Sequence, residues 1–258
     1  MKLCMFSPKG MELERGWPGR IDGDTIVQLA AQTLQAFFTG GGAAREHAVH
    51  PLDECDLRAP VLYPPSIRVF APRLADGVPF FEFRSPFPVL GPEDELTYPQ
   101  GTDELDFGAG LAAAIGADGA VGGFTLANLW SARDLARAER AAGFGPSKSG
   151  DFGISLGPTL LTPDEKISGS VVARVNGEER QTGDLGAVVD AWPQLLDHAS
   201  RNTALRPGDV LVGAFPSAET APLEPGDAVE LEADGIGILR NCIGVPVPVV
   251  ELVQGSGR

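Results

Sequence analysis

The sequence has few cysteines and histidines, and none of them is spaced like a metal site. Its three cysteines, Cys4, Cys55 and Cys242, lie far apart without a C-x-x-C pair. This spacing excludes a cysteine zinc site, requires no disulfide and fits a reducing compartment. No histidine occurs between His50 and His198, so most of the chain has no imidazole that could act as a base or a ligand.

Positive charge and long apolar runs are also scarce. The 258 residues carry 20 lysines and arginines against 35 acidic residues, a net charge of −15, and no basic cluster that would neutralise nucleic-acid phosphates. No apolar run approaches the roughly 20 residues that span a bilayer, and the first residues lack the apolar core of a signal peptide. We therefore expect a cytoplasmic protein whose partner is a small molecule, with no nucleic-acid or membrane partner.

Residues 1–60 are predicted to form a small N-terminal α/β domain. A short strand is expected at residues 2–6, and Asp24 is expected to cap a helix over residues 25–38. The apolar residues of that segment recur at spacings of three and four, which is typical of a helix face. A proline-rich stretch at residues 57–65 then marks the boundary to a main domain at residues 61–258.

The second half of the chain alternates short apolar runs with turn residues. Asn176-Gly177 indicates a hairpin between strands, and the segment 184–204 has a helical pattern that contains Pro193. Further strands are expected at residues 67–70, 168–176, 178–182, 210–215, 228–233 and 236–242. These patterns predict an α+β protein that is mainly β, built as a mixed β-roll or sandwich.

The most informative stretch is residues 122–161. Its apolar residues 123–130 predict a strand, Ser131 can cap a following helix with Asp134 as the partner of a capping box, and residues 143–150 form a glycine-rich break. This order is expected to bring Arg133 and Lys148 close to one end of the strand.

Several spaced motifs resemble those of the fumarylacetoacetate hydrolase family. They are A-N-L-W-S-A-R-D at residues 127–134, K-S at 148–149, L-G-P at 156–158, V-N-G-E at 175–178, L-R-P-G-D at 205–209 and G-I-G-I-L-R-N at 235–241. They occur in the family's order over roughly residues 60–250. The resemblance implies that family's mixed β-roll fold, and it implies a homodimer.

The residues that hold the family's divalent metal are missing. The family places Mg²⁺ or Mn²⁺ on an E-x-E pair and on the aspartate of A-N-D, whereas this chain has Gly108, Gly110 and Leu129 at the matching positions. Because these ions need oxygen ligands, the resemblance predicts that the metal cofactor has been lost. A substitute metal site on Glu104 and Asp106, which share one face of a predicted strand, stays open as an alternative.

Other positions depart from the family as well. The family's N-Y-x-x-H segment, whose histidine serves as a base, has no counterpart, and Phe215 falls within the family's T-G-T-P motif. Arg84 lies near the basic position of the family's F-F-x-K segment. The phenylalanines around it are expected to pack mainly in the core, and they are Phe80, Phe81, Phe83 and Phe87.

The resemblance implies chemistry on oxo acids or 1,3-dicarbonyl compounds. We predict a metal-independent hydrolase, decarboxylase or lyase in which the catalytic residues Arg133 and Lys148 hold an enolate or carboxylate, and in which Asp151 moves a proton. Lys148 could also be a general acid or form a Schiff base. The predicted substrate-binding residues are Ser149, Leu129, Gly108, Gly110, Arg84 and Phe215. The substrate of this predicted enzyme is expected to be a bulkier, more apolar oxo acid or a polyketide-like compound. Two alternatives stay open: a non-catalytic binding or partner subunit, and a cyclase or other shape-directed catalyst of secondary metabolism.

Overall fold

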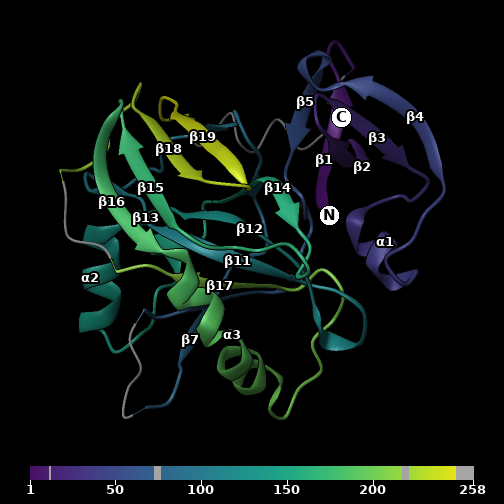
Figure 1. Ribbon diagram of the computed structural model, residues 1–258. Coiled ribbons are helices and arrows are strands. Elements are labelled where there is room, and N and C mark those ends of the chain that lie inside the picture. Colours follow the sequence, from purple (N-terminus) through teal and green to yellow (C-terminus); the bar gives the residue numbers. More distant parts are fainter. Residues whose placement is uncertain (12, 73–76, 217–220, 248–258) are drawn as a thin grey trace, which may run out of the picture.

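A large mixed sheet forms the framework of the protein in the computed structural model, which describes residues 1–258 except 12, 73–76, 217–220 and 248–258 (Figure 1). Its strands follow the order β4-β3-β2-β1-β14-β12-β11-β17-β6-β7, with β5 paired to β1 and β8 paired to β14. They are β1 (Lys2–Pro8), β2 (Trp17–Asp22), β3 (Thr25–Leu29), β4 (Glu46–Pro51), β5 (Cys55–Arg58), β6 (Ile67–Phe70), β7 (Phe81–Arg84), β8 (Val89–Leu90), β11 (Ala109–Ile115), β12 (Val121–Leu129), β14 (Ile154–Leu161) and β17 (Val210–Ala214).

Among the described residues, two smaller sheets and three α-helices complete the fold. The five-stranded sheet has the order β16-β15-β18-β19-β9, and a two-residue ladder joins β10 to β13. The strands are β9 (Glu95–Leu96), β10 (Leu105–Asp106), β13 (Ser131–Ala132), β15 (Ser170–Val175), β16 (Glu178–Asp184), β18 (Ala228–Ala233) and β19 (Gly237–Ile243). The helices are α1 (Leu34–Thr39), α2 (Arg133–Ala141), α3 (Leu185–Ser200) and three short 3₁₀ turns, η1 (Leu52–Glu54), η2 (Ala117–Gly119) and η3 (Lys148–Gly150).

The centre of the large sheet is buried on both faces, as its strand β11 shows. Leu111 and Ala113 belong to the core that the five-stranded sheet and α3 cover, whereas Ala112 and Ala114 belong to a second core with residues of β1, β14 and α1. Because side chains alternate along a strand, one strand contributes to both cores. This packing explains why β11 has an unbroken apolar sequence with no polar positions.

The predicted mainly β, α+β class is confirmed, and most expected strands are present within one or two residues. Asn176 and Gly177 turn the chain between β15 and β16 with positive φ angles of 52° and 83°, as the Asn-Gly pair indicates. Helix α3 begins where Asp184 accepts hydrogen bonds from the backbone N–H groups of Gly186 and Ala187, and Pro193 lies inside it. In the part of the chain that the structure describes, no helix is long and apolar enough to cross a membrane.

The predicted helix over residues 25–38 is wrong. Residues Thr25–Leu29 form β3, which pairs with β2 on one side and β4 on the other, and only Leu34–Thr39 is helical. The β-branched side chains of Thr25, Ile26 and Val27 favour a strand. The cap of the short helix is Thr33, whose hydroxyl accepts a hydrogen bond from the amide of Ala36.

The aromatic segment around Arg84 is also less buried than expected. Phe80, Phe83 and Phe87 are 51%, 61% and 62% exposed, and Phe81 packs against the core only in part. Strand β7 ends the order of the large sheet, and none of its four residues is buried. The expectation that these rings lie mainly in the core is therefore wrong for three of the four.

Candidate active site

A cleft of about 740 Å³ lies at one end of four neighbouring strands. The strands β12, β11, β17 and β6 are adjacent in the large sheet, and the cleft is lined where β12 ends at Leu129, β11 begins at Ala109, β17 ends at Ala214 and β6 ends at Phe70. Helix α2 and strand β7 supply further parts of the wall. Strand ends are a common place for a binding site because the adjacent loops can carry functional side chains on a rigid frame.

The cleft brings together six of the nine residues predicted to form the site, and in the sequence these six are spread from Arg84 to Phe215. The six are Arg84, Gly108, Leu129, Arg133, Ser149 and Phe215. Gly110 is further along β11, where its Cα faces Val212 and Gly213 of β17.

Lys148 and Asp151 lie outside the cleft. The Lys148 side chain is 75% exposed, and its Nζ lies 3.1 Å from Oδ1 of Asp151. The next residue, Ser149, is buried and donates its hydroxyl to Glu139 at 2.6 Å. The structure thus separates Lys148 from Arg133, because the turn η3 directs Ser149 inward and leaves Lys148 in solvent.

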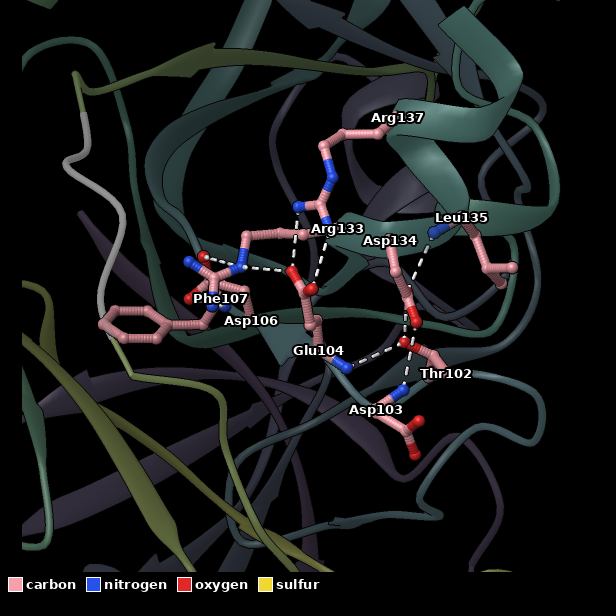
Figure 2. A network of polar contacts seen from close by, with 9 residues as sticks. All are labelled: Thr102, Asp103, Glu104, Asp106, Phe107, Arg133, Asp134, Leu135 and Arg137. Carbon is pink, nitrogen blue, oxygen red and sulfur yellow. Dashed lines mark hydrogen bonds and ion pairs between the residues drawn. The ribbon is translucent and has the colours of Figure 1, made fainter. Parts of the chain in front are cut away.

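The Arg133 side chain lies beside two carboxylates, those of Asp106 and Glu104 (Figure 2). Its Nε lies 3.5 Å from Oδ2 of Asp106 and 3.9 Å from Oε2 of Glu104. Both terminal nitrogens of Arg137 donate hydrogen bonds to the carboxylate of Glu104, at 2.8 and 2.6 Å. These bonds lower the pKa of Glu104 from its ordinary value, and the charge of Arg133 contributes less to the same shift. Arg133 therefore pairs with Asp106 and Glu104, and its neighbour Asp134 is bound elsewhere.

The start of α2 differs from the predicted capping box. Ser131 belongs to β13, where it lies opposite Asp106 of β10, and the cap position is Ala132, which makes no side-chain cap. Asp134 instead accepts hydrogen bonds from the hydroxyl of Thr102 and the amides of Asp103 and Leu135. Burial would raise the pKa of Asp134, but these donors outweigh it and the net shift is downward. The prediction of a capping box at Ser131 is wrong because Ser131 pairs with Asp106 in the β10–β13 ladder, and the helix begins two residues later, at Arg133.

Arg84 ties the loop after α2 to the end of β12. Its Nη1 donates to the backbone carbonyls of Trp130 and Gly150 at 3.1 and 3.3 Å, and its Nε donates to Glu82 at 2.8 Å. A Cβ on Gly150 would lie 1.6 Å from this Nη1, so only glycine allows the approach. In this structure, the role of Arg84 is to fix the wall on which Ser149 lies.

The residues at the family's metal positions do not fit a divalent ion. Gly108 and Leu129 line the cleft without an oxygen-bearing side chain, and a Cβ on Gly110 would lie 2.6 Å from Cγ1 of Val212. Among the described residues there is no group of three His, Cys, Asp or Glu side chains that could hold a metal ion. Asp106 and Glu104, the alternative ligands, both face arginines.

Sequence reasoning missed two arginines and a glutamine. Arg137 and Arg140 line the cleft together with Arg133, and their spacing of four and seven residues on a predicted helix could have revealed them. Gln181 is buried; it accepts a hydrogen bond from the amide of Ala109 at 2.9 Å and donates to the carbonyl of Phe215 at 3.3 Å. Nothing in the sequence pattern of β16 singled it out.

Comparison with known proteins agrees with this architecture. The sequence profile described as "Fumarylacetoacetate (FAA) hydrolase C-terminal" matches residues 71–244. The chain belongs to the fumarylacetoacetate hydrolase family. The matched range includes most of the residues that line the cleft, from Ala71 to Pro216.

Two tautomerases and a hydrolase are among the proteins to which this chain is similar. The oxaloacetate tautomerase YisK of Bacillus subtilis is 32% identical over a match that covers 62% of this chain and 60% of that protein. The mitochondrial oxaloacetate tautomerase FAHD2A of Bos taurus is 27% identical over 90% of this chain and 86% of its own length. A solved fumarylacetoacetate hydrolase from Exiguobacterium antarcticum has a TM-score of 0.76, with 25% identity over 95% of this chain and 99% of that one.

Proposed function

We propose that this protein is a metal-independent enzyme of the fumarylacetoacetate hydrolase family that acts on an oxo acid, a 1,3-dicarbonyl compound or a polyketide-like substrate. The reaction would be a C–C hydrolysis, a decarboxylation, a tautomerisation, or a repurposed lyase or cyclase step. The observation that carries the proposal is an open cleft that the Arg133 side chain lines, with its Nε 3.5 Å from Oδ2 of Asp106.

Arg133 supplies the positive charge that an enolate or carboxylate needs. Its side chain is only 15% exposed and is oriented by Asp106, and a guanidinium stays protonated at any ordinary pH. Donors that are already oriented stabilise charge as it develops in the transition state, because they need no reorganisation. Their effect is larger at a partly buried position than in bulk water.

Asp106 is the group in position to exchange a proton with the substrate. Its carboxylate lines the cleft beside Arg133 and is 14% exposed. Enolisation of an oxo acid transfers a proton from the carbon next to the carbonyl to a base, and the electron pair moves onto the oxygen that Arg133 would face. Lys148 and Asp151 take no step in this scheme, since they pair with each other in solvent.

The wall near Arg133 favours a substrate with apolar bulk. Gly108, Leu129 and Phe215 line it where the family has two metal-binding carboxylates and a hydroxyl-bearing motif. Apolar surface contributes roughly 25 cal/mol for each Å² removed from water. A substrate carrying an aryl or alkyl group next to its oxo-acid end would therefore bind better than oxaloacetate itself.

A second candidate function is a non-catalytic subunit that binds a small molecule. Two observations favour it: Arg133 already faces the carboxylate of Asp106, and Lys148 does not reach the cleft. Such a protein would hold a carboxylate ligand in the same cleft without turning it over.

Activity with and without a chelator tests the proposal. We expect oxaloacetate and aryl-substituted acylpyruvates to be turned over equally well after EDTA treatment, and elemental analysis to find no stoichiometric Mg or Mn. Arg133→Gln should lower kcat/KM by about 100-fold or more, the size of effect seen when an oxyanion donor is removed. The control Arg201→Gln, at an exposed arginine beyond α3, should leave kcat/KM unchanged.

Other outcomes would each remove part of the proposal. Activity that disappears with EDTA and returns with Mn²⁺ would overturn metal independence and point to Glu104 and Asp106 as ligands. Tight binding of an oxo acid without turnover of any substrate would support the non-catalytic subunit. Full activity of Arg133→Gln would exclude the guanidinium as the anchor.

A further inference from the structure

Strand β16 connects the five-stranded sheet to the wall of the cleft. It ends the order of the five-stranded sheet, and it contacts β11 of the large sheet (Figure 1). Gln181 and Gly183 are alternate residues of β16, so they face the same side of the strand. Both lie against Phe215, which follows β17 and forms part of the cleft wall.

The carboxamide of Gln181 joins the backbones of β11 and β17 where these strands reach the cleft. Its Oε1 accepts a hydrogen bond from the amide of Ala109 at 2.9 Å. Its Nε2 donates to the carbonyls of Phe215 at 3.3 Å and Pro216 at 3.1 Å. The amide of Phe215 donates in turn to the carbonyl of Ala109 at 3.0 Å. Because Gln181 is only 8% exposed, water does not replace these bonds without cost, and they fix Phe215 relative to Ala109.

Gly183 leaves room for the ring of Phe215. A Cβ on Gly183 would overlap Cγ and Cδ1 of that ring, so a larger residue would displace it. The Phe215 side chain is 5% exposed and belongs to the core beneath the five-stranded sheet, although it also lines the cleft. Strand β16 therefore fixes both the backbone and the ring of this wall residue.

Gln181 can influence a substrate only through the groups that it holds. Within the part of the chain that the structure describes, Ala109 and Phe215 line the cleft, whereas Gln181 and Gly183 do not. Binding sites are precise when the residues that touch the ligand are fixed by packing and by hydrogen bonds from behind. The hydrogen bonds of Gln181 and the space at Gly183 supply such support for Phe215.

We propose that Gln181 is a positioning residue that, together with Gly183, gives the cleft a preference for substrates with an aryl group by fixing the ring of Phe215. This inference rests on the proposed function, because it requires an oxo acid of that class in the cleft. Aromatic pairs favour offset-stacked or edge-to-face contacts with centroids about 4.5–7 Å apart. A displaced ring therefore loses contact with an aryl group, whereas a small oxo acid that does not reach Phe215 is unaffected.

Steady-state kinetics with two substrates tests the positioning role. The measured quantity is the ratio of kcat/KM for an aryl-substituted acylpyruvate to kcat/KM for oxaloacetate. Gln181→Met keeps the length of the side chain but removes its donor and its acceptor. It should lower this ratio by roughly ten-fold, the effect of a lost apolar contact in a specificity pocket, mainly by raising KM for the aryl substrate. A merely structural role would lower both kcat/KM values by the same factor and leave the ratio unchanged.

Gln35→Met is the matched control. Gln35 belongs to α1, and its Nε2 also donates to a backbone carbonyl, that of Tyr63, at 3.2 Å. Its replacement removes the same chemical groups away from the cleft. The ratio of the two kcat/KM values should therefore equal that of the wild type.

Two further variants keep the test decisive if Gln181→Met does not fold. Gly183→Ala places a methyl group against the Phe215 ring and should lower the ratio in the same direction. Phe215→Leu removes the ring itself. Adding Gln181→Met or Gly183→Ala to Phe215→Leu should then lower the ratio no further, because residues that act through one group are not additive.

The outcomes separate this inference from the function on which it rests. If the wild type acts on both substrates and the ratio is the same in Gln181→Met and Gly183→Ala, the positioning role is overturned and the proposed function stands. A wild type without a preference for the aryl substrate, or a further loss in the double variants, overturns it as well. If both compounds bind without turnover, the ratio of their dissociation constants decides in the same way. If neither compound is bound or turned over, both proposals fall.

Discussion

Gly150 and Arg84 show how closely two residues of the cleft wall approach each other. The guanidinium Nη1 of Arg84 occupies the place where a Cβ on Gly150 would lie, at 1.6 Å. We expect Gly150→Ala to displace Arg84 from the carbonyls of Trp130 and Gly150 and to lower the free energy of unfolding by about 1–3 kcal/mol, the usual cost of overpacking. Chemical denaturation monitored by circular dichroism measures this change.

Gly145→Ala is the matched control for this substitution. Gly145 lies in the same loop and also lines the cleft, but a Cβ there would meet no atom within 4 Å. Its free energy of unfolding should stay within about 1 kcal/mol of the wild type. Equal stability of the two variants would show that Arg84 moves aside without loss, and that it does not fix the loop.

At the scale of single residues, the sequence predicts which residues lie near the cleft. It predicts less well whether their side chains point into it. Gly108 and Leu129 follow from the match to the family's metal positions, Arg133 follows from its place after a predicted strand, and all three line the cleft. Lys148 follows from the same reasoning but points into solvent, because the direction of a loop side chain depends on partners such as Asp151. A motif fixes the position of a residue along the chain and leaves its rotamer open.

At the scale of elements, Glu139 joins helix α2 to the turn η3. It accepts hydrogen bonds from the Ser149 hydroxyl and from the amides of Ser147 and Ser149, and these donors, the hydroxyl first, lower the pKa of Glu139. A carboxylate with a lowered pKa adds stability above its ordinary pKa, about 4.3, and loses that contribution as the pH falls through the lowered value.

We therefore expect Glu139→Gln to melt below the wild type at neutral pH. The difference in Tm should persist down to about pH 4.3 and vanish at lower pH, where the wild-type carboxylate becomes protonated as well. Thermal unfolding followed across this pH range measures it. Glu178→Gln, at an exposed position of the β15–β16 hairpin, is the control measured over the same range. A constant difference for Glu139→Gln would contradict the assignment.

Elements whose turn or cap residues stand next to them in the sequence were predictable. Elements whose secondary structure depends on pairing with distant strands were not. The hairpin at Asn176 and the helix behind Asp184 follow from turn and cap chemistry, which acts within a few residues. In residues 25–38 the local signals conflict, because the apolar spacing favours a helix whereas the β-branched Thr25, Ile26 and Val27 favour a strand. Pairing with β2 and β4 decides for a strand at Thr25–Leu29.

At the scale of the whole molecule, the net charge of −15 sets how stability responds to salt. Repulsion among excess acidic residues destabilises the compact state. Raising the salt from about 10 mM to about 150 mM shortens the screening length from about 30 Å to about 8 Å, so we expect Tm to rise by a few degrees. Differential scanning calorimetry measures the rise. A Tm that falls instead would mean that surface ion pairs such as Arg174–Glu232 outweigh the repulsion.

The pairing of β1 with β14 bears on where this chain can be divided. One side of β14 pairs with β12, and the other is shared by β8 at Ile154–Ser155 and by β1 at Leu160–Leu161. A fragment that starts at residue 61 would lack β1 and would leave the second half of β14 as a bare, apolar edge. Such edges recruit other strands and lead to aggregation. Residue 61 is therefore a poor starting point for a fragment, and recombination with relatives should carry β1 and β14 together.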